Sequence, residues 1–218
     1  MPASDSYKGL SNAPSDWDAR HRAATQGTVV APASFVLELL PLLPRGPALD
    51  LACGTGRHAL LLAARQQPVT AVDSSRVGLD ILEQRALASG LRTNRGQYSG
   101  SVTPSHGGIH LMEVDLERAT LAVAAFALIL CVQYLQRSLF EAIARALAPG
   151  GMLMFETYTR AQLEFPGGPK NPEHLLECGE LRAAFPSLRL LFYRELRAGK
   201  GIASLIAQKA FMGHRQPQ

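Results

Sequence analysis

An acidic residue followed by a pair of glycines is the first feature of this sequence whose spacing could do chemistry. Within LDLACGTGRHALLLA, Asp50 lies four residues before Gly54, and Gly56 follows after one more residue. The short apolar segment before the glycines has the pattern of a buried strand, and the segment after them has the pattern of a helix. Glycine tolerates positive φ and close backbone approach to a ligand, and the first helical turn presents free N–H groups. The stretch therefore predicts a strand–turn–helix that binds a cofactor.

Two classes of cofactor fit such a turn. Gly54, Gly56 and Ala59 satisfy the looser form of the nucleotide-pyrophosphate pattern G-x-G-x-x-G/A, which any strand–turn–helix can match by chance. The pattern D-x-x-x-G-x-G adds Asp50, whose carboxylate is awkward beside a pyrophosphate but useful beside an ammonium group. S-adenosylmethionine (SAM) has a cationic amino-acid end and no phosphate, so the acid favours SAM over NAD(P).

A second acid lies where a ribose would be bound. Asp73 ends the predicted strand 69–73 and lies 17 residues after Gly56. A carboxylate at this place can accept hydrogen bonds from the ribose hydroxyls of either cofactor, so Asp73 discriminates less between them. The alternative is that Asp73 only caps the helix that begins near Ser74. Its distance from the glycine turn favours a role in binding.

The predicted elements alternate between strand and helix. Strand-like segments lie at 48–53, 69–73, 109–115, 126–134, 152–158, 188–196 and 202–210. Strands alternating with helices predict right-handed crossovers and a parallel sheet covered on both faces. The last two segments are joined by RAGKG, which predicts a hairpin and one antiparallel strand near the edge. The predicted fold class is therefore α/β, a three-layer Rossmann-like sandwich around a mostly parallel seven-stranded sheet.

Composition limits the kinds of protein that this chain can be. The chain has 218 residues, 47% of them hydrophobic, and a formal net charge of +4. Its basic residues are spread along the sequence, which argues against a dedicated nucleic-acid-binding protein. No apolar run reaches the roughly 18 residues that a membrane helix needs, and the N-terminus lacks the hydrophobic region of a signal peptide. We therefore expect a cytoplasmic protein without membrane contact, whose oligomeric state the sequence leaves open.

One domain accounts for most of the chain. We expect a flexible lead at 1–15, a single domain at 16–210 with a polar loop insert at 92–108, and a tail at 211–218. A loop of that length is commonly either a functional lid or disordered, and the Gly/Ser/Thr-rich sequence favours disorder, so that trimming it should leave cofactor binding intact. The three cysteines form no Cys-x-x-Cys pair, and the histidines lack metal-ligand spacing, so no metal site is predicted.

The order of the motifs resembles a known family. LDLACGTGRHALLLA, VTAVDSS, MEVDLE, FALILCVQYL and LAPGGMLMFETY resemble, in order, the successive motifs of class I SAM-dependent methyltransferases over about residues 16–210. Within that superfamily the chain looks most like a bacterial small-molecule group related to the tellurite-resistance methyltransferases. The resemblance implies transfer of a methyl group from SAM, with S-adenosylhomocysteine (SAH) as product, to a small-molecule acceptor.

The resemblance also implies roles for individual residues. The cofactor would be bound at the methionine part by Asp50, Ala52, Cys53, Gly54 and Gly56, at the ribose and adenine by Asp73, Ser74, Asp115 and Leu116, and near the methyl group by Cys131 and Val132. Purely structural roles are the alternatives. Asp115 could instead be a turn residue after a strand, and Cys53 and Cys131 could be small residues of the core. Trp17 and Arg22 could fold over the cofactor, although Trp17 fits a packing anchor equally well.

Fewer residues can be assigned to binding of the methyl acceptor than to binding of the cofactor. The fourth strand ends in CVQY without the Pro-Pro of enzymes that methylate exocyclic base amines, so a small molecule is the favoured acceptor. Candidate acceptor-lining residues are Arg57, Tyr134 and Tyr158. No catalytic residue is assigned, because in-line methyl transfer depends mainly on positioning. The alternatives are a non-catalytic SAM-binding module, an NAD(P)-dependent oxidoreductase and an RNA methyltransferase.

Overall fold

The computed structural model describes residues 14–24, 30–97 and 100–211. Its strands are β1 (Ala48–Leu51), β2 (Val69–Asp73), β3 (Thr93–Gly96), β4 (Ile109–Glu113), β5 (Phe126–Val132), β6 (Leu147–Tyr158), β7 (Arg189–Arg197) and β8 (Gly201–Gln208). Its helices are α1 (Pro14–Ala24), α2 (Ser34–Leu39), α3 (Arg57–Ala64), α4 (Arg76–Ala88), α5 (Phe140–Ala146) and α6 (Glu180–Ala183), with 3₁₀ turns at Leu40–Leu42, Arg137–Leu139, Arg160–Glu164 and Pro172–His174.

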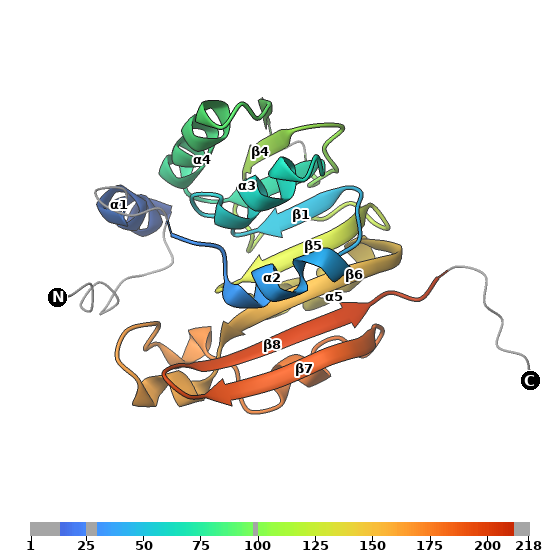
Figure 1. The fold of residues 1–218 in the computed structure, drawn as a ribbon. Coiled ribbons are helices and arrows are strands. Elements are labelled where there is room, and N and C mark those ends of the chain that lie inside the picture. Colours follow the sequence, from blue (N-terminus) through green and yellow to red (C-terminus); the bar gives the residue numbers. More distant parts are fainter. Residues whose placement is uncertain (1–13, 25–29, 98–99, 212–218) are drawn as a thin grey trace, which may run out of the picture.

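The strands form one sheet in the order β3-β4-β2-β1-β5-β6-β8-β7 (Figure 1). Every neighbouring pair is parallel except those of β8, which runs antiparallel to both β6 and β7. The predicted α/β class and the single antiparallel strand near the edge are confirmed. The predicted number of strands is wrong, because the sheet has eight strands and not seven.

The additional strand lies in the segment that we expected to be a loop. Strand β3 pairs in parallel with β4, from Thr93 opposite Ile109 to Gly96 opposite Met112. Its sequence, TNRG, lacks the apolar pattern of a strand because β3 is an edge strand with half-buried and exposed side chains. The expected insert at 92–108 is therefore corrected for its first part, and trimming there would remove a strand. Residues 98–99 lie outside the described part of the chain.

The expected N-terminal lead is shorter than predicted. Helix α1 begins at Pro14, so two residues assigned to the lead belong to a helix. Residues 1–13 of the lead and 212–218 of the tail lie outside the described residues. Across the described residues, the structure contains no helix with the length and apolarity to cross a bilayer.

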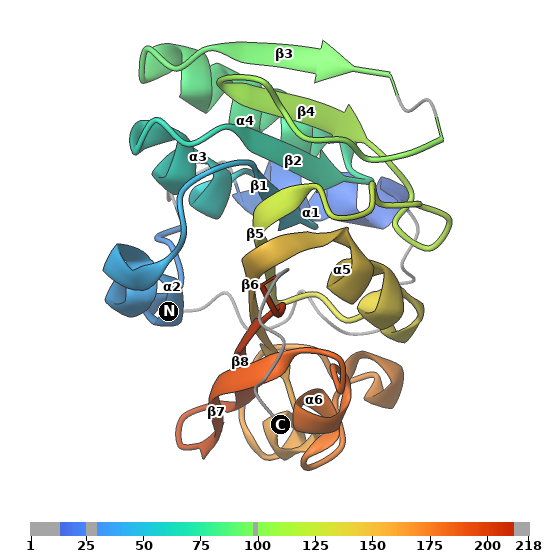
Figure 2. The ribbon, with the colours of Figure 1, turned by 90° about the vertical axis from the view of Figure 1, so that its right-hand side faces the viewer.

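Side-chain alternation along the strands divides the core into two halves. In β1, Leu49 and Leu51 pack on the side of α5 and α6, whereas Ala48 packs on the side of α2, α3 and α4. The helices therefore cover both faces of the sheet, which gives the expected three layers (Figure 2). By the same alternation Asp50 faces the side of α3. Helix α1 lies against the start of α4, beyond the ends towards which the arrows of β1 and β5 point (Figure 1).

The glycine turn connects β1 to α3 with little room for side chains. Gly54 and Gly56 have φ values of 53° and 82°, in the left-handed region that favours glycine. A Cβ atom on Gly56 would lie 2.0 Å from Cδ1 of Leu82, a fully buried residue of α4. The turn can therefore lie against α4 only because this position lacks a side chain.

We predict that Gly56→Ala destabilises the protein more than Gly90→Ala does. Both glycines have positive φ, but a Cβ on Gly90 would meet no atom within 4 Å. Gly90→Ala should therefore cost about 1 kcal/mol of backbone strain, and Gly56→Ala a further ~1–3 kcal/mol from overpacking. Equilibrium unfolding in urea, followed by circular dichroism, measures both losses. Equal losses in the two variants would contradict the steric role of Gly56.

Candidate cofactor and acceptor site

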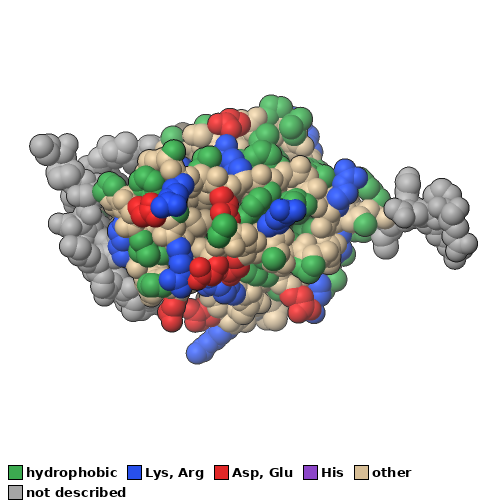
Figure 3. All heavy atoms as spheres, turned by 90° about the horizontal axis from the view of Figure 1, so that it is seen from below, with side chains coloured by type: hydrophobic (Ala, Val, Ile, Leu, Met, Phe, Trp, Pro, Cys, Tyr) green, Lys and Arg blue, Asp and Glu red, His purple; other side chains and the backbone are tan. Residues whose placement is uncertain are grey.

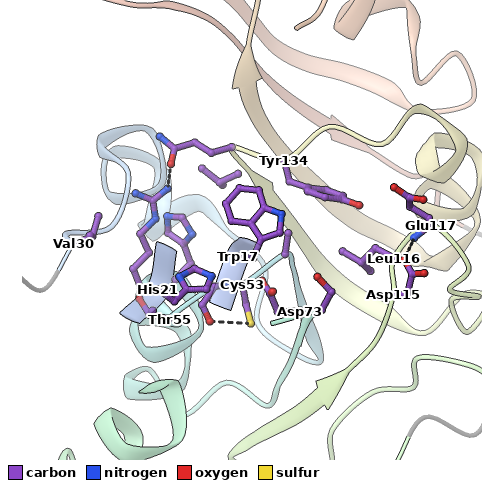
Figure 4. Close-up of a pocket in the computed structure, with 17 residues that line it drawn as sticks. Trp17, His21, Val30, Cys53, Thr55, Asp73, Asp115, Leu116, Glu117 and Tyr134 are labelled. Carbon is purple, nitrogen blue, oxygen red and sulfur yellow. Dashed lines mark hydrogen bonds between the residues drawn. The ribbon is translucent and has the colours of Figure 1, made fainter. Parts of the chain in front are cut away.

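A cavity of about 300 Å³ lies at the carboxyl ends of the central strands, where ligands bind in open α/β sheets (Figure 4). The residues that line it come from α1, from the segment before α2, from the glycine turn and α3, and from the carboxyl ends of β2 and β5 and the segments that follow β2, β4 and β5. They are Trp17, His21, Val30, Ala52, Cys53, Gly54, Thr55, Arg57, His58, Asp73, Ser74, Asp115, Leu116, Glu117, Val132, Gln133 and Tyr134.

Asp73 joins the two turns at this edge of the sheet. Its Oδ2 accepts a hydrogen bond of 2.7 Å from the N–H of Gly54, and its Oδ1 accepts one of 2.8 Å from the N–H of Ser75. Burial raises the pKa of Asp73, while the backbone hydrogen bonds from Ser75, Gly54 and Ser74 act against that rise. The N-cap of α4 is Ser75, whose Oγ accepts from the N–H of Gly78, whereas the Asp73 carboxylate fixes the glycine turn to the turn after β2 and lines the cavity.

Asp50 lies behind the cavity lining. Its side chain is 1% exposed, and Oδ2 has no hydrogen-bond partner among the described residues. Burial raises its pKa to about 7, although the nearby charge of Arg57 and a hydrogen bond from the N–H of Ala59 act in the opposite direction. An unsatisfied buried carboxylate next to the glycine turn suits a cationic ligand group, which would favour its charged form.

Helix α1 covers the cavity from outside the sheet. Asp18 fastens it to the start of α4, because Oδ1 accepts hydrogen bonds from Ser75 Oγ at 2.5 Å and from the N–H of Val77 at 3.2 Å. Trp17 and His21 line the cavity with stacked rings whose centroids are 6.2 Å apart. Figure 4 shows Trp17 between His21 and Tyr134.

The two residues proposed as a cover differ in their placement. Trp17 lines the cavity, and the guanidinium of Arg20 lies 4.3 Å from its ring centroid. Arg22 does not line it: its side chain is 65% exposed, and it contacts Asp18 at 3.9 Å one helical turn away. The structure does not bring Arg22 to the wall of the cavity, and its role as a cover stays a prediction. His21 takes that place because it lies one residue earlier, on the face of α1 that packs against Gly54 and Gly78.

Two of the three acceptor-side candidates, Arg57 and Tyr158, are linked through a residue that sequence reasoning missed. The Nη2 of Arg57 donates to Oε1 of Gln133 at 2.7 Å, and Nε2 of Gln133 donates to the hydroxyl of Tyr158 at 3.2 Å. Arg57, Gln133 and Tyr134 line the cavity, whereas Tyr158 lies behind Gln133. Gln133 could have been singled out, since it stands within the CVQY motif.

The remaining predicted residues fall into two groups. Ala52, Cys53, Gly54, Ser74, Asp115, Leu116 and Val132 line the cavity, whereas Gly56 and Cys131 do not. Gly56 serves the turn itself, and Cys131 is 1% exposed, with Sγ near the carbonyl of Tyr134. Burial raises the pKa of both the Cys53 and Cys131 thiols, so both remain protonated and act as small core residues. Asp115 also makes a turn, since its Oδ1 accepts from the N–H of Glu117 at 3.0 Å.

Other lining residues were not predicted at all: His21, Val30, Thr55, His58, Glu117 and Gln133. His58 is a structural histidine, because its Nε2 accepts a hydrogen bond from the N–H of Ala33 at 3.1 Å. Burial and the charge of Arg57 lower its pKa to about 3, so it is neutral near pH 7. No group of three or more His, Cys, Asp or Glu side chains in the described ranges could hold a metal ion.

Known proteins resemble this chain in sequence and in fold. Residues 48–151 match the family model described as "Methyltransferase domain". A trans-aconitate 2-methyltransferase of Rhizobium meliloti (strain 1021) is 31% identical over 177 residues, which cover 78% of this chain and 59% of the relative. A cypemycin N-terminal methyltransferase of a Streptomyces species is 32% identical over 120 residues, 55% of this chain and 45% of the relative.

Solved structures share the fold. TehB from Haemophilus influenzae superposes with a TM-score of 0.65 at 17% identity, over 88% of this chain and 67% of that one. An S-adenosylmethionine-dependent methyltransferase from Mesorhizobium loti gives a TM-score of 0.60 at 17% identity, over 81% of this chain and 98% of that one. The chain therefore carries a methyltransferase domain at residues 48–151, and the recognition of its motifs as those of class I SAM-dependent methyltransferases is confirmed. It spans about three-fifths of the length of the trans-aconitate relative.

We predict that Asp50→Asn makes the protein increasingly more stable than the wild type as the pH rises from 4 to 7. The pKa of Asp50 is about 7 in the folded protein against an ordinary value of 3.8 for an aspartate, so folding favours the protonated acid. In the wild type, the contribution of Asp50 to the free energy of unfolding is fully present below pH 4 and is lost as the pH rises through 7. The loss is at most about 4 kcal/mol. Asparagine cannot ionise and keeps an acceptor for the N–H of Ala59.

Urea unfolding at several pH values measures this difference in the free energy of unfolding. Glu38→Gln removes an exposed carboxylate on α2 and serves as the control. A difference between Asp50→Asn and the wild type that does not change with pH would contradict the raised pKa of the buried Asp50 carboxyl group.

Proposed function

We propose that this protein transfers a methyl group from SAM to a small-molecule acceptor. The observation that carries the proposal is the set of carboxylates around the glycine turn. Asp50 lies beneath the turn, Asp73 is hydrogen-bonded across it, and Asp115 and Glu117 line the same cavity. A pyrophosphate would be repelled by this set, whereas a sulfonium and an ammonium group would be attracted.

The residues present fit SAM at each of its parts. Asp50 would balance the charge of the ammonium group, since its buried Oδ2 lacks a partner among the described residues. The backbone of 52–54 would bind the methionine end, where Gly54 leaves room next to His21. Asp73 would accept from the ribose hydroxyls, and Asp115 with Leu116 would bind the adenine. When bound, SAM supplies an electrophilic methyl group on a neutral leaving sulfide.

The chain would contribute positioning and exclusion of water. Trp17 and His21 of α1 cover the cavity, and Tyr134 forms part of its wall. Burial lowers the pKa of His21 despite attraction from Asp73 and Asp18, and it lowers that of His58, so neither adds a fixed positive charge against the sulfonium. No general base is assigned, because an acceptor that arrives deprotonated needs only to be held in line with the methyl group.

The relatives support an organic acid as the acceptor. Matched proteins of Rhizobium meliloti and Sinorhizobium fredii are named for trans-aconitate. The chain spans 59% and 57% of the lengths of these two relatives, and we propose that it acts on an acid of the same class.

Nucleic acid is not part of the proposed acceptor class. On the face that Figure 3 shows, basic and acidic side chains alternate with apolar ones instead of forming a basic patch. A cytoplasmic location belongs to the same proposal, since Cys53, Cys131 and Cys178 are all free, as in a reducing compartment.

The direct test is a side-by-side titration with SAM, SAH and NADH. Trp17 is the single tryptophan of the chain and lines the cavity, so its fluorescence should report occupancy. We expect saturable changes with SAM and SAH at micromolar concentrations, confirmed by calorimetry, and none with NADH. Binding of NADH alone would favour the oxidoreductase alternative. Binding of SAM without formation of SAH in the presence of any organic acid would favour a non-catalytic SAM-binding module.

We predict that Asp73→Ala loses SAH binding and also lowers stability. The variant leaves the N–H groups of Gly54 and Ser75 without their acceptor, which should cost about 1–3 kcal/mol in urea unfolding. Asp73→Asn keeps one acceptor oxygen and should lose less stability, yet still bind SAH weakly because it lacks the carboxylate. Unchanged SAH affinity in Asp73→Asn, measured by calorimetry, would exclude the ribose role.

A further inference from the structure

We propose that Arg57, held in place by Gln133 and Tyr158, binds a carboxylate of the acceptor. The inference rests on the proposed function and adds where the acceptor lies and what recognises it. Arg57 touches the acceptor in this proposal, and Gln133 is a positioning residue.

The strand order separates two halves of the site. Asp73 ends β2 and Asp115 follows β4, and both strands lie on one side of β1. Gln133 and Tyr158 belong to the ends of β5 and β6, which lie on the other side of β1. The strand order thus reverses between β1 and β5, the place at which a bound molecule meets both halves. With the acids assigned to the cofactor, the half over β5 and β6 is left for the acceptor.

The charges of the two halves are opposite. Arg57 is the one arginine or lysine among the described residues that line the cavity. His58 is neutral near pH 7 because its pKa is about 3. The half next to β5 therefore offers one permanent positive charge. A guanidinium pairs with a carboxylate through two parallel hydrogen bonds, which gives both strength and orientation.

Gln133 fixes the direction of the guanidinium. Its carboxamide accepts from Nη2 of Arg57 at 2.7 Å and donates to the hydroxyl of Tyr158 at 3.2 Å. Its backbone is held as well, since its N–H donates to the carbonyl of Glu156 at 2.7 Å with φ at 62°. A left-handed glutamine at the mouth of a cavity is a costly conformation of the kind that clusters at functional sites. A neutral carboxamide orients Arg57 without cancelling its charge.

One competing role follows from the charge of Arg57. The charge of Arg57 also lowers the pKa of Asp50, so Arg57 could serve the cofactor half instead. The two roles differ in which ligand loses affinity when the charge is removed.

The experiment titrates SAH-saturated protein with trans-aconitate by calorimetry, so that no turnover is needed. We expect Arg57→Gln to weaken trans-aconitate binding by about tenfold to a hundredfold, as for a lost charge-assisted pair, and to change SAH affinity by less than about threefold. Arg145→Gln, which removes an exposed arginine of α5, is the matched control and should change neither. The trimethyl ester of trans-aconitate lacks the charge and should bind equally to the wild type and Arg57→Gln.

Two variants of Gln133 separate positioning from folding. Gln133→Glu places a carboxylate on the guanidinium and should abolish trans-aconitate binding while Arg57 remains present. Gln133→Gly removes the carboxamide but relieves the positive φ, so it should fold at least as stably and bind trans-aconitate several-fold more weakly.

The outcomes distinguish this inference from the proposed function. Wild-type protein that binds SAH but neither trans-aconitate nor citrate would overturn the carboxylate site and leave the methyltransferase proposal standing. A larger loss of SAH than of trans-aconitate affinity in Arg57→Gln would assign Arg57 to the cofactor. Failure of the wild type to bind SAH would overturn both.

Discussion

The carboxylate of Asp73 joins the two turns on which the whole site is built. One oxygen holds the turn after β1 through Gly54, and the other holds the turn after β2 through Ser75. The pairing of β1 with β2 brings these turns side by side, but strands alone do not fix the loops beyond them. A charged acceptor for two backbone N–H groups does so, at the expense of burying a carboxylate. Asp18 of α1 accepts hydrogen bonds from Ser75 and Val77, so the position of α1 depends on the same turn after β2.

The second organising feature is the distribution of charge across the sheet. The carboxylates gather over β1, β2 and β4, and the arginine points towards Gln133 at the end of β5. Because all these strands end at one edge, a small number of side chains creates a cavity with a negative and a positive half. Such a cavity suits a cationic donor and an anionic acceptor, which would also attract each other across the site.

Much of this organisation could be predicted from the sequence, for identifiable reasons. The buried strands have apolar patterns, and Asp50, Gly54 and Asp73 have a spacing that follows from the geometry of β1, the turn and β2. Strand β3 escaped prediction because an edge strand need not be apolar, and its TNRG has the composition of a loop. His21 was not predicted because tertiary packing decides which face of α1 lies against Gly54 and Gly78. Gln133 was not predicted as a site residue because its hydrogen bonds join residues that lie far apart in the sequence.

The most direct test of the central claim is a crystal structure of the protein with SAH. The account predicts that the ribose hydroxyls lie on Asp73, that the adenine lies by Asp115 and Leu116, and that the sulfur faces Gln133 and Tyr134 with Arg57 beyond it. Trp17 should lie against the bound molecule. An adenosine placed over β5 and β6, next to Arg57, would contradict the division of the cavity into a cofactor half and an acceptor half.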